Sequence, residues 1–193
     1  HIQVSSTWMI ERADAPKIFS AIAQRSLALD TGGHPHVAYG EDRLYYAWYD
    51  GSQWRFETVD DTPGAGSHAS LDMDSLDRPH ISYYGGDGTL KYAYRTGATW
   101  QIATVDAAGW VGWYTSLALD AADHPHISYS PVSLGGLRYA SFNGTTWYTT
   151  TVDNEGAYTS LALDQDGWPH IAYFGTEEWD LKYAAYDLSL IHI

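Results

Sequence analysis

Four histidines of this sequence each follow a proline, and their even spacing raises the question of a shared metal ion. They are His36, His80, His126 and His170. Imidazoles at equivalent points around an axis could bind a transition metal. The ligands of one ion gather at one site, however, whereas residues that recur in every repeat usually support the repeat itself. Each histidine comes shortly after an aspartate that ends a predicted strand. We therefore expect an Asp–His hydrogen bond that fixes the intervening turn, and no metal at these histidines.

An acidic turn at residues 164–167, with the sequence D-Q-D-G, is the best candidate for a cation site. Calcium prefers carboxylate and carbonyl oxygens, and Asp164 and Asp166 supply two carboxylates. The other repeats lack this form, and no glutamate follows at the distance that completes a calcium-binding loop. A plain Asp-Gly turn explains the same residues. Calcium at Asp164 and Asp166 is the one cofactor that the sequence leaves open, and no other cofactor is predicted.

Tryptophan and tyrosine are abundant, with 9 Trp and 16 Tyr in 193 residues, and eight of the tryptophans form two groups. One group recurs once per repeat and consists of Trp8, Trp54, Trp100 and Trp147. We expect these rings to fill the space between repeats. The other group falls outside that position, mainly in loops, and consists of Trp110, Trp113, Trp168 and Trp179. Loop aromatics suit the C–H faces of sugars or a protein partner, so these four are the candidate ligand-binding residues.

No residue set in the sequence has the pattern of a catalytic centre. The chain has no cysteine, which removes thiolate nucleophiles, thiolate metal sites and disulfides. Acid–base or nucleophilic catalysis needs polar residues that occur once and break the repeat symmetry. The seven arginines are scattered through the repeats. We therefore predict no catalytic residues and predict that the protein is not an enzyme.

The charge balance of the chain limits the classes of molecule that it can bind. The chain has 10 Lys and Arg against 24 Asp and Glu, a net charge of -14, which repels phosphate backbones and anionic lipid surfaces. We therefore expect no nucleic-acid partner. No stretch approaches the length of apolar sequence that spans a bilayer, so we also expect no membrane insertion.

The chemistry-bearing residues are positioned by an internal repeat. The Pro-His pairs are separated by 44, 46 and 44 residues, and the recurring tryptophans by 46, 46 and 47. Between these markers each copy contains four segments of strand length, typified by SLALD, PHISY, LKYA and W-x-x-x-T-V-D. Large residues alternate within the segments, and glycine-containing turns separate them. Four strands repeated in register, with no helical period between them, predict the blades of a β-propeller.

We predict an all-β fold, a four-bladed β-propeller in which each blade is a four-stranded antiparallel sheet. A single domain covers residues 1–187, and residues 188–193 form a tail outside the repeat. The expected blades are residues 25–60, 68–106, 114–153 and 158–187, the last of them completed by residues 6–14.

Residues 6–14 match the fourth strand of the repeat, whereas copy four stops after its third strand. Pairing of this segment with the last blade would remove two exposed sheet edges. It can pair within its own chain and close the ring. It can also complete the last blade of a neighbouring molecule, which would give a dimer or an open filament. The sequence leaves both arrangements open.

The hairpins before the recurring tryptophans resemble a known motif. Residues Tyr49–Trp54, Thr96–Trp100 and Asn143–Trp147 are similar to a shortened Asp-box, S-x-D-x-G-x-x-W, of sialidase-type propellers. The glycine and tryptophan fit, and the leading Ser-x-Asp is absent or displaced. The PHISY, LKYA and W-x-x-x-T-V-D pattern also resembles repeats of large secreted bacterial and archaeal proteins. These resemblances imply a propeller and an extracellular location. A sialidase site would need an arginine trio, which the seven scattered arginines do not form, so sialidase activity is not carried over.

Together these features predict an extracellular, non-catalytic propeller that serves protein–protein interaction or self-assembly, with exchange of the N-terminal strand as one route. The alternative is a lectin-like propeller that binds glycans through its loop aromatics. The expected partners are accordingly a second copy or another protein, or a glycan.

Overall fold

Every regular element of the described chain is a β-strand. The computed structural model describes residues 10–13, 25–132 and 135–186, and this part contains fifteen strands and no helix. The strands are β1 (Leu27–Leu29), β2 (Pro35–Gly40), β3 (Leu44–Tyr49), β4 (Trp54–Asp60), β5 (Ser70–Met73), β6 (Pro79–Tyr84), β7 (Leu90–Thr96), β8 (Thr99–Asp106), β9 (Val111–Leu119), β10 (Pro125–Pro131), β11 (Leu137–Phe142), β12 (Trp147–Asp153), β13 (Ala157–Leu163), β14 (Pro169–Phe174) and β15 (Leu181–Ala185). None of the described residues forms a helix suited to crossing a membrane.

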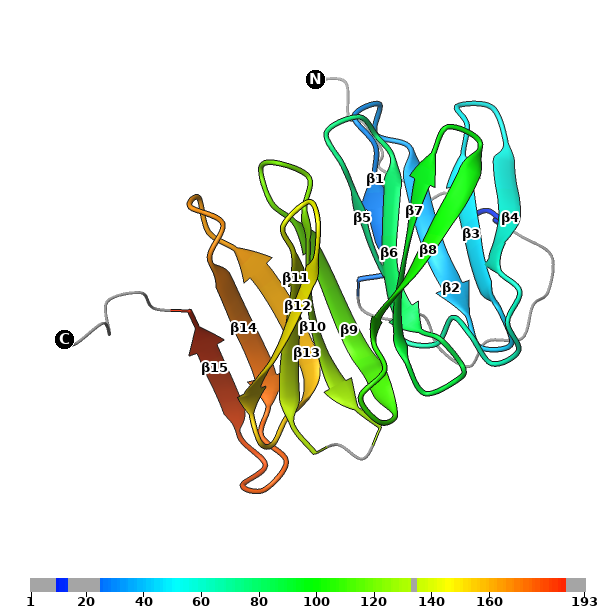
Figure 1. Cartoon of the computed structure of the whole chain (residues 1–193). Coiled ribbons are helices and arrows are strands. Elements are labelled where there is room, and N and C mark those ends of the chain that lie inside the picture. Colours follow the sequence, from blue (N-terminus) through cyan, green and yellow to red (C-terminus); the bar gives the residue numbers. More distant parts are fainter. Residues whose placement is uncertain (1–9, 14–24, 133–134, 187–193) are drawn as a thin grey trace, which may run out of the picture.

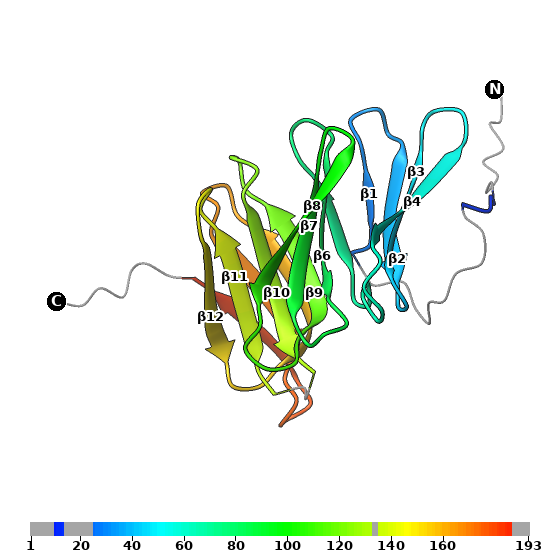
Figure 2. The same cartoon turned by 45° about the vertical axis from the view of Figure 1, so that its right-hand side comes forward.

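The strands form four antiparallel sheets that follow one another along the chain. Their strand orders are β1-β2-β3-β4, β5-β6-β7-β8, β9-β10-β11-β12 and β13-β14-β15. Figures 1 and 2 show the sheets side by side in sequence order, each pleated sheet facing the next. The predicted all-β propeller architecture is confirmed.

The hydrophobic core lies between successive sheets because the period-two alternation of each strand gives every sheet two apolar faces. Leu44 and Tyr46 of β3 pack with Leu71 of β5 and Ile81 of β6. The same repeat positions meet again between the second and third sheets, and between the third and fourth. Full burial of one such leucine contributes about 1.5 to 3 kcal/mol, so each sheet depends on its neighbour for its core.

A repeated polar link joins the same sheets. Asp60, at the end of β4, accepts a hydrogen bond of 2.8 Å from the Tyr83 hydroxyl and lies 3.3 Å from Lys91 Nζ. Equivalent groups link the next two junctions: Asp106 with Tyr129 and Arg138, and Asp153 with Tyr173 and Lys182. Buried carboxylates are stable only when they are paired in this way, so this link supports the packing at each of the three junctions.

The fourth sheet differs from the others. Its described part has three strands, and these strands make no packing against β1–β4 comparable to that between consecutive sheets. Within the predicted strand 6–14, residues 10–13 are described and form no strand; the rest of that segment, like the tail 188–193, lies outside the described residues. Glu11 lies beside the first sheet, where its carboxylate accepts a 3.3 Å hydrogen bond from Trp54 Nε1. The described chain is therefore an arc of four sheets.

Candidate functional site

The four candidate tryptophans lie at two opposite ends of the strands. One end, here called the turn end, carries the turns between the first two strands of each sheet and is uppermost in Figure 1. The other, the connection end, carries the loops that join successive sheets and the loops between second and third strands. Trp110, Trp113 and Trp179 are at the connection end, whereas Trp168 is in the β13–β14 turn, stacked on Tyr186 at 5.5 Å. The structure therefore separates Trp168 from the other three.

Aromatic residues at the connection end share an unusual backbone conformation. Five of them have a positive φ: His68 (57°), Trp110 (48°), Tyr114 (52°), Tyr158 (52°) and Trp179 (59°). The remaining non-glycine cases among the described residues are Asp77 and Asp123 in turns of the opposite end, and aspartate tolerates this conformation. For a bulky residue it costs about 1 to 3 kcal/mol and is typical of functional sites. Every strained non-glycine residue described at this end is thus aromatic.

Three of these residues occupy the same repeat position: His68 lies just before β5, and Tyr114 and Tyr158 lie in the first half of β9 and β13. The ring of His68 lies 4.7 Å from that of Tyr114, and Tyr114 lies 4.1 Å from Tyr158. Trp113 adds a fourth ring, 5.1 Å from His68. We call His68, Trp113, Tyr114 and Tyr158 the aromatic arc. It crosses three sheets without a break, which a single loop could not do.

Burial favours the uncharged forms of His68 and Tyr114 in the aromatic arc. Burial lowers the pKa of His68, and the charge of Glu41 opposes this only in part. Burial and the hydrogen-bonded Tyr158 hydroxyl raise the pKa of Tyr114. The Thr115 hydroxyl donates a 2.6 Å hydrogen bond to the His68 carbonyl and holds the strained backbone between neighbouring sheets.

Two exposed tryptophans extend this surface. Trp179 lies 5.7 Å from Phe174, which lies 6.2 Å from Tyr158 of the arc. Trp110 projects beside Gly88 in the neighbouring β6–β7 loop. Their exposure, combined with a fixed backbone, makes them the aromatic groups most available to a ligand.

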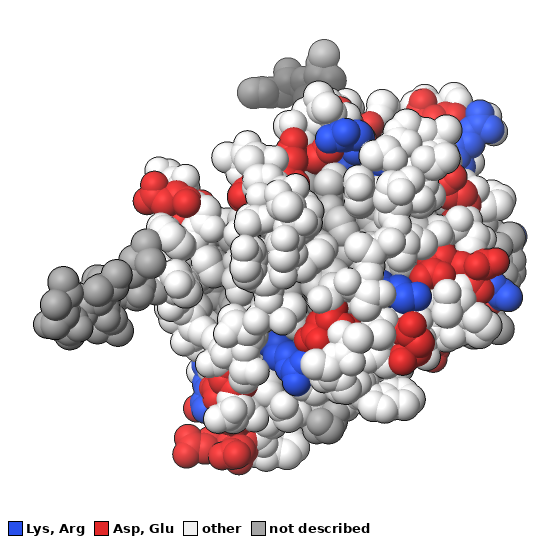
Figure 3. All heavy atoms as spheres, in the orientation of Figure 1, with Lys and Arg blue, Asp and Glu red and all other residues white. Residues whose placement is uncertain are grey.

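The described cations near the connection end are paired with carboxylates. The pairs are Arg43 with Asp42, Lys91 with Asp60, Arg138 with Asp106, and Lys182 with Glu155. On the face seen in Figure 3, Lys and Arg groups lie mostly beside acidic groups, with uncharged surface between them. Within the described chain this end therefore offers no free cluster of positive charge for an anionic ligand.

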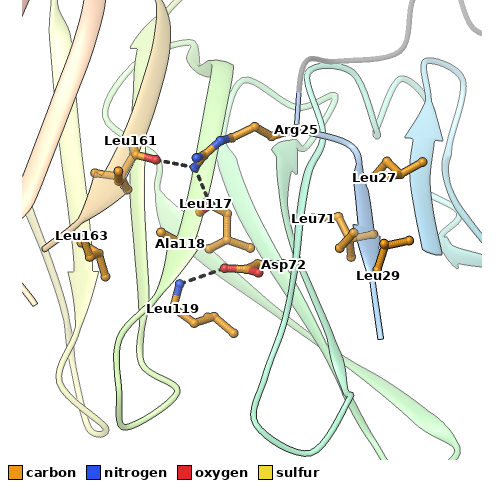
Figure 4. Close-up of a pocket in the computed structure, with 12 residues that line it drawn as sticks. Arg25, Leu27, Leu29, Leu71, Asp72, Leu117, Ala118, Leu119, Leu161 and Leu163 are labelled. Carbon is orange, nitrogen blue, oxygen red and sulfur yellow. Dashed lines mark hydrogen bonds between the residues drawn. The ribbon is translucent and has the colours of Figure 1, made fainter. Parts of the chain in front are cut away.

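A cavity of about 530 Å³ lies where the first strands of all four sheets converge. Figure 4 shows that Arg25 reaches from the first sheet to the carbonyls of Leu117 and Leu161, and that Asp72 accepts a hydrogen bond from the Leu119 amide at 3.1 Å. Burial raises the pKa of Asp72. The two charged groups of this leucine-rich cavity, Arg25 and Asp72, both form contacts between sheets. The cavity is therefore the axis around which the four sheets are arranged.

The recurring histidines lie within their own sheets and do not converge. His80 is representative: its Nδ1 is hydrogen-bonded to the Tyr92 hydroxyl, and its Nε2 lies 3.3 Å from Asp74. His170 has the same 3.3 Å contact with Asp164, and the corresponding separations in the first and third sheets are 3.5 and 3.6 Å. The described residues contain no group of three His, Asp or Glu side chains placed to hold a metal. Each histidine thus connects a turn aspartate to a tyrosine on the third strand of its own sheet.

The acidic turn at Asp164 is held by its own backbone. One carboxylate oxygen accepts hydrogen bonds from the amides of Asp166 (3.0 Å) and Trp168 (2.8 Å), and the other faces His170. This is the geometry of an Asp turn. Calcium at Asp164 and Asp166 stays a prediction.

The recurring tryptophans lie at junctions between sheets. Trp100 contacts Tyr46 of the preceding sheet at 5.3 Å and donates a 2.9 Å hydrogen bond to Glu57, and Trp147 contacts Tyr92 at 5.3 Å. Trp8 lies outside the described residues. Trp100 and Trp147 therefore act as wedges between sheets, whereas Trp54 packs on Tyr49 of its own sheet.

Comparison with known proteins defines the class of fold. No family model and no curated protein matches the sequence. Among solved structures, an intramolecular trans-sialidase from Ruminococcus gnavus is 18% identical with a TM-score of 0.53, over 85% of this chain and 42% of that one. The SapL1 lectin, in complex with alpha methyl fucoside, is 17% identical with a TM-score of 0.61, over 83% and 60%. A GH43 glycoside hydrolase is 13% identical with a TM-score of 0.54, over 84% and 40%. The chain shares its propeller fold with these sialidase, lectin and glycosidase structures and spans about half of their length.

One prediction from the sequence is overturned by these comparisons. The absence of a recognisable catalytic set led to the expectation that the protein is not an enzyme. Sialidases and a GH43 glycoside hydrolase are among the structures that share the fold. The expectation was wrong because it rested on motif spacing, whereas a propeller brings site residues together from separate blades.

The sequence reasoning included Trp113 among its candidates but missed the other three residues of the aromatic arc, although a signal for them exists. Gly66, Gly112 and Gly156 recur at one repeat position, and each is followed two residues later by His68, Tyr114 or Tyr158. A glycine and an aromatic residue at a fixed offset in three repeats mark a strand entry with a special backbone.

Proposed function

We propose that this chain is a carbohydrate-binding β-propeller that binds neutral sugars on the aromatic residues of its connection end. The observation that carries the proposal is the set of five aromatic residues held at positive φ at that end. Backbone strain of this kind persists only when the surroundings over-determine it, and it clusters at ligand sites.

The chemistry of the surface agrees with a sugar ligand. Pyranose rings present apolar C–H faces that pack on flat aromatic rings, and the exposed rings of Trp110 and Trp179 are of that kind. Backbone groups and side-chain hydroxyls of the surrounding loops can form hydrogen bonds with the sugar hydroxyls. The SapL1 lectin, a propeller of the same fold, was solved with alpha methyl fucoside.

A neutral sugar is favoured over an anionic one. The cations near this end are already paired with carboxylates, and the chain carries a net charge of -14. An anionic sugar would have to break one of those pairs and approach a surface of like charge.

The test is a glycan array that includes neutral and sialylated sugars, followed by calorimetric titration of the strongest neutral ligand. We expect Trp110→Ala and Trp179→Ala each to weaken binding about tenfold or more, the effect of losing one stacking group of about 1.4 kcal/mol.

Trp168→Ala is the matched control, because it removes an exposed tryptophan from the opposite end. It should leave the affinity within about twofold. An array that is silent for neutral sugars, or an equal loss of affinity in Trp168→Ala, would contradict the proposal.

A further inference from the structure

Two charged residues interrupt the repeat along the first strands of the sheets. Asp72 of β5 stands at a position where the other three sheets have alanine, namely Ala28, Ala118 and Ala162. Arg25 stands two residues before Leu27, where the later sheets have an uncharged residue, namely Ala69, Thr115 and Thr159. At each position, three of the four sheets form without a charge. A residue that occurs once in a repeat array is more typical of a site than of the scaffold.

Both residues line the axial cavity of about 530 Å³ that Figure 4 shows. The rest of its lining consists of leucine and alanine residues from the first strands of all four sheets. Solvent reaches this lining, because Leu29 is 57% exposed and Ala162 is also exposed. A concave, mostly apolar space of this volume with a few polar groups has the form of a small-molecule site.

Arg25 brings a positive charge into this cavity without an ion pair. Most described lysines and arginines lie 3.5 Å or less from a carboxylate oxygen. Arg25 instead donates from Nη1 to neutral groups, the Ser116 hydroxyl at 3.3 Å and the carbonyls of Leu117 and Leu161. In the described part of the chain its Nε and Nη2 have no acceptor. These two nitrogens form the edge with which arginine binds both oxygens of a carboxylate.

Asp72 determines what the other part of the cavity accepts. Its Oδ1 accepts a 2.9 Å hydrogen bond from the Met73 amide, and its Oδ2 accepts a 3.1 Å bond from the Leu119 amide. Arg25 contacts β9 at Leu117, so Asp72 lies nearer the turn end than the guanidinium does. A carboxylate fixed in this position repels a second negative charge. An anion that fits this cavity therefore has its charge at the Arg25 end only.

We propose that the axial cavity binds a small monocarboxylate with an apolar body. The ligand carboxylate pairs with Nε and Nη2 of Arg25, and the apolar body packs on the leucines of the first strands. Asp72 discriminates against dicarboxylates. Trp110 and Trp179 do not line this cavity, so the inference does not depend on the sugar site.

The experiment is a calorimetric titration of the full chain at neutral pH with octanoate as the probe. Two compounds of the same chain length are compared with it: octanamide, which has a neutral head, and suberate, which has a carboxylate at each end. We expect octanoate to bind about tenfold or more tightly than either, because only octanoate pairs with Arg25 without meeting Asp72. Arg25→Gln should remove the preference for octanoate over octanamide.

Arg25 also joins sheets, so a second variant tests the cavity without changing either charged residue. Ala162→Leu places a larger apolar side chain at an exposed position of the lining and should weaken octanoate binding about tenfold or more. Ala98→Leu makes the same change in the exposed turn between β7 and β8. This control should keep the affinity within about twofold. Circular dichroism checks that each variant is folded.

Asp72→Asn tests the discrimination against a second carboxylate. The amide oxygen still accepts from Leu119, whereas the charge is gone, so suberate should approach the affinity of octanoate.

Three outcomes would overturn the proposal: no binding of octanoate, equal affinities for octanoate and octanamide, or unchanged octanoate affinity in Ala162→Leu. The affinity of Ala162→Leu for a neutral sugar should stay at the wild-type value, because the sugar proposal rests on Trp110 and Trp179. The two proposals therefore stand or fail separately.

Discussion

Single carboxylates at the sheet junctions determine much of the stability. Burial disfavours the charge of Asp106, but the Tyr129 hydroxyl, the Ala108 amide and Arg138 outweigh it and hold its pKa below the usual range. Asp106 accepts hydrogen bonds from three groups, which lie on a neighbouring sheet and in a loop. Removal of its carboxylate leaves all three groups without a partner.

We expect Asp106→Ala to lower the free energy of unfolding by about 2 to 4 kcal/mol, because it leaves buried polar groups without partners. Tyr129→Phe removes one hydroxyl and should cost about 1 kcal/mol. Urea unfolding followed by tryptophan fluorescence measures both. Equal costs for the two variants would show that the hydroxyl alone accounts for the link.

The recurring histidines predict a pH dependence of stability. Burial lowers the pKa of His36, His80 and His126 below the usual value of about 6.5, and the neighbouring aspartates oppose this only in part. Below pH 6.5 the unfolded chain binds protons that the folded chain does not, so the free energy of unfolding decreases as the pH is lowered. This stability is fully present above pH 6.5.

Urea midpoints between pH 7.5 and 5 measure this effect, and we expect them to fall steadily. His80→Gln should make the decline shallower, because one of the titrating groups is gone. A midpoint that is flat or rises over this range would refute the assignment.

At the scale of the element, a glycine controls how each connection enters the next sheet. Gly66 has a φ of 100°, and a Cβ there would lie 2.6 Å from the Arg43 carbonyl oxygen and 2.8 Å from Leu44 Cα. The backbone of the connection therefore packs directly on the backbone of β3, and this contact places His68 in the aromatic arc.

Gly66→Ala should destabilise the fold by about 3 kcal/mol or more, because the left-handed φ is unfavourable for alanine and the close backbone approach leaves no room for a Cβ. Gly97 is the matched control: its φ is 60°, and a Cβ at that position would meet no atom within 4 Å. Gly97→Ala should cost about 1 kcal/mol. Thermal unfolding compares them, and similar losses would rule out the close approach as the cause.

At the scale of the whole molecule, the four sheets differ in how many neighbours they have. The second and third sheets each pack between two described sheets, whereas the first and fourth each pack against one. Local opening is easiest where few apolar contacts must break.

Amide hydrogen exchange should therefore be slowest in β6 and β10 and fastest in β15 among the strands, as measured by mass spectrometry of peptides. Uniform protection of all four sheets at low concentration would contradict an open arc.

The sequence by itself determined the repeat, the strands and the class of fold. Alternation with period two and a 44- to 47-residue recurrence are properties of neighbouring residues, so SLALD, PHISY and LKYA identify strands without any tertiary information. The turn aspartate and its histidine lie six residues apart, as Asp74 and His80 do, and such a local contact is also visible in the sequence.

Only the tertiary structure decided which residues share a site and where the arc stays open. His68, Tyr114 and Tyr158 come from three different sheets, Trp168 is separated from the other loop tryptophans by the length of a strand, and Asp106 meets Tyr129 across a junction. These contacts depend on how one sheet is placed against the next. That placement is set by packing between residues far apart in the chain, so it cannot be predicted from a local sequence pattern.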